Sequence, residues 1–320
     1  MCQQVKLDEL CVHKIETISS DENGLIDYFD IASVDNTKKK IISHQSLKIE
    51  EAPSRAKQIV QLNDILVSTV RPNLNAVTII DNETKNKMVA STGFCVLRAS
   101  EKIEPRYLFY FVQSPTFINS MTAQATGASY PAVSNSIVKS SHIPLPDLPT
   151  QRRIADTLDK VSEEIEVCRR MLGELDLMVK AKFVEMFGDV FDNPKNFEMR
   201  LFGDYASQMN IGPFGSDLKN DCFVSKENGY CMVYEQKHAI DKNILVEARY
   251  VTEEKYQQMK RFDIGPGDII VSCRGTIGKC FILPDDAPHG IIHPSLMMIK
   301  PKSTVNSTFL LFLLESILKE

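Results

Sequence analysis

Residues 146–189 constrain the fold more than any other part of the chain, because they carry one long amphipathic pattern. Apolar side chains recur there at alternating intervals of four and three residues, which is the heptad pattern of a helix that packs against another long helix. The seam positions are Ile154, Leu158, Val161, Ile165, Cys168, Leu172, Leu175 and Val179. Taken alone, the run fits an ordinary amphipathic helix equally well. The sequence on either side of it favours a coiled-coil helix.

Both ends of this pattern carry helix-boundary signals. Pro149 suits a first helical turn, Asp147 or Thr150 can cap it, and Gly188 can adopt a left-handed stop. About 37 residues at about 1.5 Å each would give a rod on the order of 55 Å. That is longer than a compact domain of this size needs within itself, so we predict a spacer helix over residues 147–189.

The length and composition of the chain indicate two domains without a membrane span. With 320 residues and 43% hydrophobic content, the chain can bury more than one core. No run approaches the roughly 18 apolar residues of a transmembrane helix, and the eight cysteines form no Cys-x-x-Cys pair. We expect a cytoplasmic protein with reduced thiols. His289 and His293 lie in a stretch interrupted by Pro and Gly, so we expect no metal site.

The charge of the chain is balanced along its length. Residues 1–150 carry 15 basic and 16 acidic side chains, residues 151–190 carry 7 and 9, and residues 191–320 carry 15 and 17. A protein that held nucleic acid alone by neutralising phosphates would usually show a basic excess. The chain therefore either does not bind DNA or binds it together with other subunits.

An internal repeat divides the chain into two similar halves. Three short matches keep their order and a nearly constant offset of 202 to 204 residues, which makes chance unlikely as their origin. The matched pairs are Asp64–Ser68 with Asp268–Ser272, Arg98 with Lys300, and Tyr107–Phe111 with Phe309–Leu313. We predict that the chain contains two copies of one fold.

The local pattern of each copy mixes strands and helices. Strands are predicted at 28–35, on both sides of a turn within 61–80, and at 91–98, with helix at 105–121. The predicted fold class is α+β, with two repeated domains of mixed α/β structure joined by the long coiled-coil helix. We expect domains at 1–146 and 190–320 on either side of a spacer at 147–189, the second domain being incomplete at its C-terminus.

Motifs for cofactor chemistry are absent from the sequence. There is no Gly-x-Gly-x-x-Gly for a methyl donor, no Gly-x-x-x-x-Gly-Lys-Ser/Thr for ATP, and no Asn-Pro-Pro-Tyr type of loop for a flipped adenine. We find no cluster of carboxylates and lysine tied to a strand that would suggest a nuclease. We therefore expect a protein that is not an enzyme.

Three stretches resemble the specificity subunit of type I restriction-modification systems. They are the GPGDIIVSCRGTIG hairpin at 265–278, the IPLPDLPTQRRIADTLDKV run at 143–161 and the KFVEMFGD end of the long helix at 182–189. The duplicated layout adds to the resemblance, which covers nearly the whole chain. Its most specific part is the PLP-x-L-x-x-Q-x-x-IA-x-x-L pattern within the second stretch.

The resemblance implies a function in DNA recognition. In that family each repeat is a target recognition domain that reads one half of a bipartite DNA site, and two long helices act as a ruler between them. The helices also dock the methyltransferase (M) subunits, and restriction (R) subunits join through these. The chain itself would be non-catalytic, with S-adenosylmethionine, ATP and magnesium held by the partner subunits.

Sequence readout requires side chains with paired donors and acceptors, such as Arg for guanine and Asn or Gln for adenine. We predict phosphate contacts from Lys38, Lys39 and Lys40. The other DNA-binding candidates in the first repeat are Ser68, Thr69, Arg71, Asn73 and Asn75. In the second repeat they are Gln236, Lys237, His238, Ser272, Arg274, Thr276 and Lys279. Arg71 and Arg274 follow the repeated strand by three and two residues, so the repeat would place an arginine at the same position twice.

Three alternatives remain open at this point. The chain could be the specificity portion of a fused restriction-methylation enzyme, whose catalytic part would lie outside these residues. It could be a coiled-coil interaction protein without a DNA role. A truncated subunit could also self-associate through the seam from Ile154 to Val179 and read a symmetric DNA site.

Overall fold

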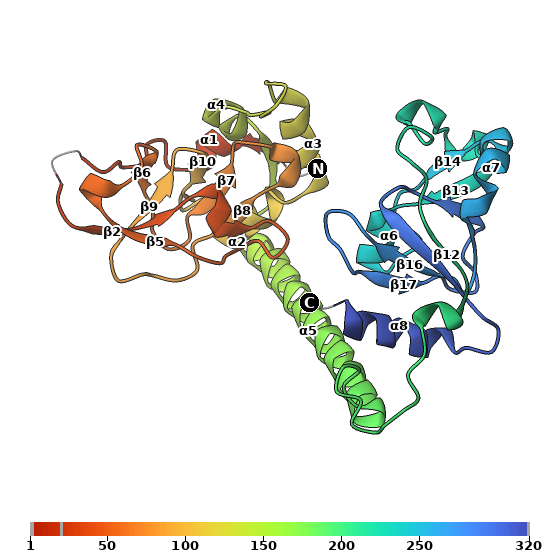
Figure 1. Ribbon diagram of the computed structural model, residues 1–320. Helices are drawn as coiled ribbons and strands as arrows, with labels where there is room; N and C mark the ends of the chain where they lie inside the picture. The colour runs from red at the N-terminus through yellow and green to blue at the C-terminus, as the bar shows by residue number, and fades with distance from the viewer. Residues whose placement is uncertain (1–2, 20–21, 319–320) are drawn as a thin grey trace. The chain divides into compact units, whose positions relative to one another are not determined.

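The computed structural model describes residues 3–19 and 22–318, which form two compact units. Unit 1 comprises residues 1–169 and unit 2 residues 170–320, so the border falls inside the long helix α5 (Leu148–Phe187). Figure 1 shows this helix in green, running out of the mixed strands and helices of unit 1. The predicted domain boundaries instead place the whole helix between the domains, and they stay a prediction.

Unit 1 is built on two main sheets. The four-stranded sheet has the order β5-β2-β9-β6, and its central pair, β2 and β9, is parallel. The three-stranded sheet has the order β10-β7-β8 and is antiparallel throughout. These strands are β2 (Leu25–Phe29), β5 (Gln45–Lys48), β6 (Ala56–Ile59), β7 (Ile65–Ser68), β8 (Val77–Ile79), β9 (Lys87–Ser91) and β10 (Phe94–Leu97).

Shorter elements complete unit 1. Strand β1 (Gln3–Lys6) pairs antiparallel with β11 (His142–Leu145), and β3 (Val34–Asp35) pairs with β4 (Lys40–Ile41). The helices before α5 are α1 (Leu7–Leu10), α2 (Pro105–Phe111), α3 (Pro115–Gln124) and α4 (Asn135–Lys139). The 3₁₀ helices are η1 (Ile31–Ser33), η2 (Ile49–Glu51) and η3 (Pro72–Leu74).

Unit 2 repeats this topology. Its sheet β14-β13-β18-β15 again has a central parallel pair, β13 and β18, and the sheet β12-β19-β16-β17 contains the counterpart of β10-β7-β8. The strands are β12 (Ala206–Ile211), β13 (Cys231–Tyr234), β14 (Arg249–Val251), β15 (Asp263–Ile264), β16 (Ile269–Ser272), β17 (Cys280–Ile282), β18 (Gly290–Ile292) and β19 (Leu296–Pro301). The helices are α6 (Gln236–Asp241), α7 (Glu253–Met259) and α8 (Ser307–Ile317), with 3₁₀ helices η4 (Phe202–Asp204), η5 (Asn220–Cys222), η6 (Lys226–Asn228) and η7 (Lys260–Phe262). The predicted α+β fold class with two repeated domains and a long helix is confirmed.

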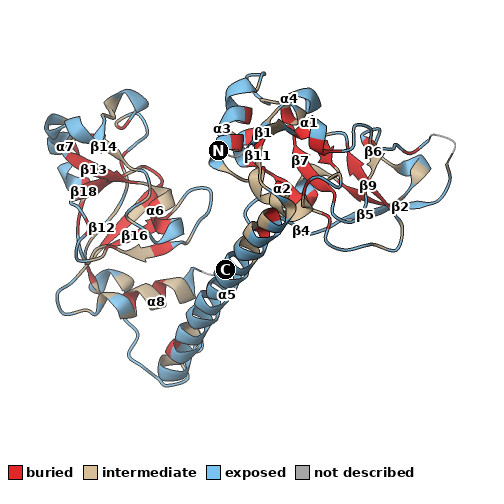
Figure 2. Ribbon diagram, turned by 180° about the vertical axis from the view of Figure 1, so that it is seen from behind, coloured by how far each residue is buried: buried red, intermediate tan, exposed pale blue. Residues whose placement is uncertain are grey.

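Strand β7 is buried on both faces, which explains its uninterrupted apolar sequence. Leu66 packs with Phe29 and Phe94 in the core between the two sheets. Ile65 points the other way, into the core beneath α2 and α3. Strand β16 does the same in unit 2, where Ile270 and Ile269 enter two different clusters. Strands β7 and β16 accordingly lie among the red, buried parts of Figure 2.

Helix α5 begins and ends where the sequence signals placed it. The Asp147 carboxylate accepts a hydrogen bond from the Thr150 backbone N–H at 3.0 Å, and Gly188 ends the helix with φ of 81°. The helix has 40 residues, three more than predicted, which gives about 60 Å. Figure 2 shows its middle as largely exposed.

The start of α5 is held in unit 1 by polar contacts. The Arg106 guanidinium of α2 pairs with Asp156 at 2.9 Å and with Asp159 at 2.5 Å, and the Tyr110 hydroxyl donates to Asp159 at 2.7 Å. Gln151 is buried, where its side-chain oxygen accepts from the Glu104 backbone N–H at 2.9 Å. Burial and the hydrogen bond to Asp159 raise the pKa of Tyr110 to about 12, so this hydroxyl keeps its proton at neutral pH.

Within residues 3–19 and 22–318, none of the helices is long and apolar enough to cross a membrane.

Candidate nucleic-acid interface

The hairpin loop of unit 1, residues 69–75, follows the buried strand β7. Ser68 and Thr69 are buried at its entrance. The Ser68 hydroxyl donates to the Val70 carbonyl at 2.9 Å, and the Thr69 hydroxyl donates to the Gly93 carbonyl at 2.9 Å. Both predicted contact residues therefore use their hydroxyls inside the fold, where they fix the direction of the loop.

The other end of this loop is fixed by Asn75 and Lys39. The Asn75 side chain is buried and donates to the Val112 carbonyl at 2.9 Å. Its amide oxygen accepts from the Lys39 ammonium at 2.9 Å. Burial lowers the pKa of Lys39 from its ordinary value. Lys39 thus supports the loop from within and is not directed at a phosphate in this structure.

The remaining two lysines of the run differ in their surroundings. Lys38 is exposed. Lys40 lies 2.8 Å from the Glu166 carboxylate on α5, and both side chains are more than half exposed. An exposed pair of this kind contributes at most about 1 kcal/mol and can exchange for another partner. The predicted phosphate contacts of Lys38 and Lys40 stay a prediction.

Arg71 and Asn73 are the exposed polar side chains of loop 69–75. Arg71 adopts a left-handed backbone conformation with φ of 49°, and its N–H donates to the Pro131 carbonyl at 2.7 Å. Its guanidinium lies over the ring of Tyr130, 4.9 Å from the centroid. Sequence reasoning missed Tyr130. The only signal for it was its place in the polar TGASYPAVSN segment.

The corresponding loop of unit 2, residues 273–278, has the same entrance. The Cys273 N–H donates to the Ser295 carbonyl at 3.0 Å, as the Thr69 N–H donates to the Gly93 carbonyl at 3.0 Å. Two residues after Cys273 comes Gly275, with φ of 65°, and two residues after Thr69 comes Arg71, with φ of 49°. Gly275 is therefore the counterpart of Arg71, and the prediction that the repeat places an arginine at the same position twice is wrong.

The predicted contact residues of loop 273–278 and its base divide into exposed and buried ones. Arg274, Thr276 and Lys279 have exposed side chains. Ser272 is buried, and its hydroxyl accepts from the Lys279 backbone N–H at 2.9 Å. Ser272 thus closes the base of the loop, as Ser68 does in unit 1.

Helix α6 lies beside loop 273–278. The Gln236 amide donates to the Thr276 carbonyl at 3.2 Å, and the Lys237 ammonium lies 3.4 Å from the Glu235 carboxylate. His238 is buried, and its Nδ1 accepts from the Glu235 backbone N–H at 2.9 Å. Burial lowers the pKa of His238, so the ring is neutral at neutral pH. His238 serves the packing of α6 and does not reach the surface.

A second arginine stack lies at the same end of unit 2. The Arg249 guanidinium lies over the Phe223 ring, 3.7 Å from the centroid, and forms an ion pair with Glu235. Burial raises the pKa of Glu235, but the hydrogen bond and charge of Arg249 outweigh this and lower it overall. The sequence did not predict Arg249, Phe223 or Glu235 as site residues, because no sequence pattern links positions in three separate elements.

The heptad seam of α5 changes from half-buried to exposed along the helix. Ile154 and Leu158 are half-buried against the rest of unit 1, whereas Leu172 and Leu175 are 63% and 54% exposed. The other exposed seam positions are Val161, Ile165, Cys168 and Val179. An apolar stripe of this length on a helix indicates a surface for another protein.

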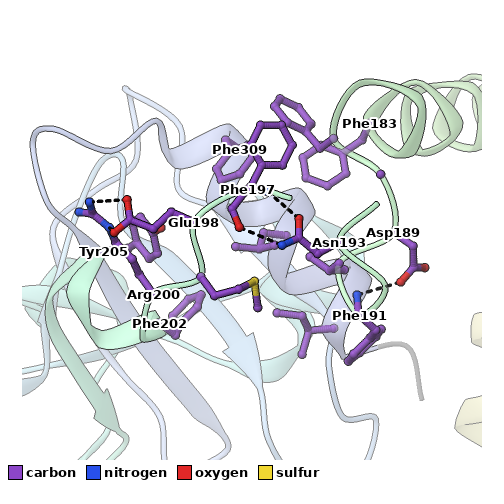
Figure 3. A pocket seen from close by; sticks show the side chains of 16 residues that line it. Phe183, Asp189, Phe191, Asn193, Phe197, Glu198, Arg200, Phe202, Tyr205 and Phe309 are labelled. Carbon is purple, nitrogen blue, oxygen red and sulfur yellow. Dashed lines mark hydrogen bonds and ion pairs between the residues drawn. The ribbon is translucent and has the colours of Figure 1, made fainter. Parts of the chain in front are cut away.

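The last turns of α5 pack on α8 around an apolar pocket of about 600 Å³, shown in Figure 3. The Phe183 ring lies 4.8 Å from that of Phe187 and 5.6 Å from that of Phe309. The Asn193 amide donates to the Phe197 carbonyl at 2.8 Å and keeps the following turn closed beside the pocket. This aromatic cluster holds the end of α5 in unit 2.

Both hairpin loops thus present polar side chains on a rigid base. Buried hydroxyls fix each loop at its root. Within residues 3–19 and 22–318, the side chains of Arg71, Asn73 and Arg274 form no hydrogen bond or ion pair, so they can pair with an outside partner. Such side chains match the donors and acceptors that base edges display in a DNA groove. The exposed candidates are Lys38, Arg71, Asn73, Arg274, Thr276 and Lys279, with Tyr130 added by the structure.

Comparison with known proteins agrees with this arrangement. The family model described as the type I restriction modification DNA specificity domain matches residues 2–175. The HindI specificity subunit of Haemophilus influenzae is 27% identical over 158 residues, which cover 48% of this chain and 34% of that one. The MjaVIII specificity subunit of Methanocaldococcus jannaschii is 31% identical over 83 residues, covering 26% and 19%. The chain thus spans about a third of the first of these curated relatives and about a fifth of the second.

A solved structure extends the likeness to the whole fold. A chain from a study of complex assembly and conformational transition of the type I R-M system superposes with a TM-score of 0.54 and 25% identity. The match covers 99% of this chain and 80% of that one. The likeness therefore includes unit 2, beyond the reach of the family model.

Proposed function

The chain belongs to the family of type I restriction-modification DNA specificity domains, and from this we propose that it reads DNA sequence for a restriction-modification complex. Each unit would bind one half of a bipartite site in double-stranded DNA. The chain would be the non-catalytic, cytoplasmic reader, while partner subunits carry out methylation and cleavage.

The observation that carries this proposal is the repeated hairpin loop. Both units place a loop with exposed polar side chains after the same doubly buried strand, β7 or β16. The loops differ in length and in their exposed residues, whereas their roots are held by equivalent hydrogen bonds. A constant scaffold with variable loops is what a pair of readers of two different half-sites requires.

The partners of the chain follow from the exposed seam of α5. We propose that M subunits dock along this helix and that R subunits join through them. S-adenosylmethionine, ATP and magnesium would then be bound by these partners. The net charge of −5 supports such sharing, because partners that enclose the DNA would supply part of the positive charge that phosphates need.

The same seam supports a second candidate. Two copies of the chain could pair through Leu172, Leu175 and Val179, which are exposed in the single chain. A symmetric dimer of this kind would present the same unit twice and read a symmetric DNA site. The two candidates differ in the symmetry of the sequence that is recognised.

Methylation mapping tests both candidates. The chain is co-expressed with the methyltransferase subunit encoded beside it, and methylated adenines are located on host DNA by single-molecule sequencing. An asymmetric bipartite motif supports the two-unit reader, and a symmetric motif supports the dimer. A complex that forms but methylates no defined motif contradicts the proposed function and favours an interaction protein without a DNA role.

A further inference from the structure

Arg71 holds a backbone conformation that its own type disfavours. Left-handed φ strains a residue with a side chain, and at the equivalent position unit 2 has Gly275, which adopts the same region without strain. Strained residues of this kind cluster at functional sites, which makes the Arg71 side chain a candidate for a functional role.

The segment that carries Tyr130 is also held in a fixed shape. Thr126 and Ala132 exchange two backbone hydrogen bonds, at 3.0 and 2.9 Å. Gly127 has φ of 104°, and a Cβ there would meet the Tyr130 carbonyl oxygen at 2.9 Å, so the turn requires glycine. Tyr130 is nevertheless 70% exposed. The turn therefore presents this ring to solvent on a fixed backbone.

The guanidinium of Arg71 is oriented but unpaired. Its Cζ lies over the Tyr130 ring, and the N–H donors of a guanidinium lie around the edge of the planar group. Within residues 3–19 and 22–318, no carboxylate lies within ion-pair distance of this group, and its side chain donates no hydrogen bond to another protein atom. The structure thus keeps a flat, charged donor edge ready for an external acceptor.

Guanine offers the acceptor pattern that fits such an edge. Its O6 and N7 atoms lie side by side in the major groove and accept two parallel N–H donors from one guanidinium. A phosphate also accepts two donors, but a phosphate contact carries no sequence information. A guanidinium placed over an aromatic ring, 4.9 Å from its centroid, is restricted in position and is suited to the base edge.

We propose that Arg71, stacked on Tyr130, reads a guanine in the half-site recognised by unit 1. This inference rests on the proposed function and gives it a specific residue pair. Arg71 forms the two hydrogen bonds, and Tyr130 is a positioning residue that keeps the guanidinium in the plane of the base.

The test is methylation mapping with substituted chains in the complex with the neighbouring methyltransferase. Arg71→Gly suits the backbone, so it should fold at least as well as the parent chain. We expect it to methylate sites with any base at one former guanine position of one half-site, with discrimination there reduced at least tenfold. Arg71→Lys should relax the same position, because an ammonium cannot form the planar pair of hydrogen bonds.

Tyr130 variants separate positioning from folding. Tyr130→Phe keeps the aromatic face and should keep the motif, whereas Tyr130→Leu should partly relax the same guanine position. Arg55→Ala is the matched control, because it removes an exposed guanidinium of unit 1 that is neither part of the stack nor a DNA-binding candidate. It should leave every position of the motif unchanged. Thermal unfolding of each complex checks that the variants are folded.

The outcomes distinguish this inference from the function on which it rests. An unchanged motif with Arg71→Gly, or an equal decrease of methylation at all sites, would overturn the guanine contact, and the equal decrease would indicate a phosphate contact. If the parent complex itself produces no motif, the proposed function fails and this inference fails with it.

Discussion

The Asp64–Arg98 ion pair and its counterpart Asp268–Lys300 explain two of the sequence matches between the repeats. Arg98 donates two hydrogen bonds of 2.8 Å to the fully buried Asp64 carboxylate. Lys300 lies 3.6 Å from Asp268. In each case the carboxylate also accepts from a backbone N–H three residues before it, at Gln61 or Gly265. In both units the repeated aspartate thus links the start of one strand, β7 or β16, to the end of its neighbour, β10 or β19.

The two pairs should differ in their contribution to stability. Asp64→Ala leaves Arg98 without its partner in a largely buried place, which should lower the free energy of unfolding of unit 1 by about 3 kcal/mol. Asp268→Ala should cost unit 2 about 1 kcal/mol, because the longer contact of Lys300 is weaker and its flexible chain can turn to water. Hydrogen exchange in each unit measures both losses. Equal losses would contradict the assignment of the tighter pair to unit 1.

Ionisation of Asp27 makes the stability of unit 1 depend on pH in the acid range. Its side chain is 2% exposed. Burial raises its pKa, but hydrogen bonds from Ser46 and Asn86 outweigh burial and lower the pKa to about 2. The carboxylate therefore stabilises the fold above its ordinary pKa near 4, and this contribution is lost as the pH falls through about 2.

Asp27→Asn should accordingly lower the free energy of unfolding of unit 1 by about 2 kcal/mol at pH 7. The difference between the parent chain and the variant should shrink as the pH falls from about 4 towards 2, because the parent carboxylate then becomes protonated. Denaturant unfolding at several pH values measures this. A difference that stays constant down to pH 2 would show that ionisation of Asp27 is not the cause.

At the scale of elements, α5 is held by different chemistry at its two ends. Arg106, Asp156 and Asp159 anchor its start through charges, whereas Phe183 and Phe187 anchor its end through aromatic packing. The helices involved, α2 and α8, contain the two segments Tyr107–Phe111 and Phe309–Leu313 that match in sequence. Between these anchors the seam is exposed, which leaves the middle of the helix for partners.

Substitutions on the seam test its role as an interface. The double variant Leu172→Gln/Leu175→Gln should change the stability of the free chain by no more than about 0.5 kcal/mol, because both side chains are exposed. It should reduce co-purification with the methyltransferase subunit, or self-association, at least tenfold. Leu177→Gln is the control, since Leu177 is 68% exposed but lies outside the heptad seam. Equal losses from the double variant and the control would argue against a heptad interface.

The elements were more predictable than the side chains that they carry. The heptad spacing, the Asp147 cap and the Gly188 stop predicted α5, because such signals act within a few residues of sequence. The burial of Thr69 and His238 could not be predicted, because it depends on strands and helices that come from elsewhere in the chain. Tyr130 was missed for the same reason: its partner Arg71 lies 59 residues earlier, and no periodic pattern connects the two.

At the scale of the whole molecule, the proposed function makes α5 a ruler. Inserting one heptad after Arg169 adds about 10.5 Å of helix and preserves the seam, which corresponds to about three base pairs of DNA at about 3.4 Å each. We expect the gap between the half-sites to lengthen by about three unread base pairs, with the bases of both half-sites unchanged. Methylation mapping reads both properties at once, and replacing seven residues without changing the length is the control. A change in the half-site bases would refute the ruler.

The pairing of β1 with β11 affects how unit 1 is synthesised. Gln3 pairs with Leu145, so β1 cannot pair until β11 has left the ribosome, about 140 residues later. At about 5–20 residues per second this delay is roughly 7 to 30 s. Loop closure over such a distance is slow, and an unpaired strand edge can pair with other chains meanwhile. Nascent chains that stall before Leu145 should therefore aggregate more readily than chains that have passed it.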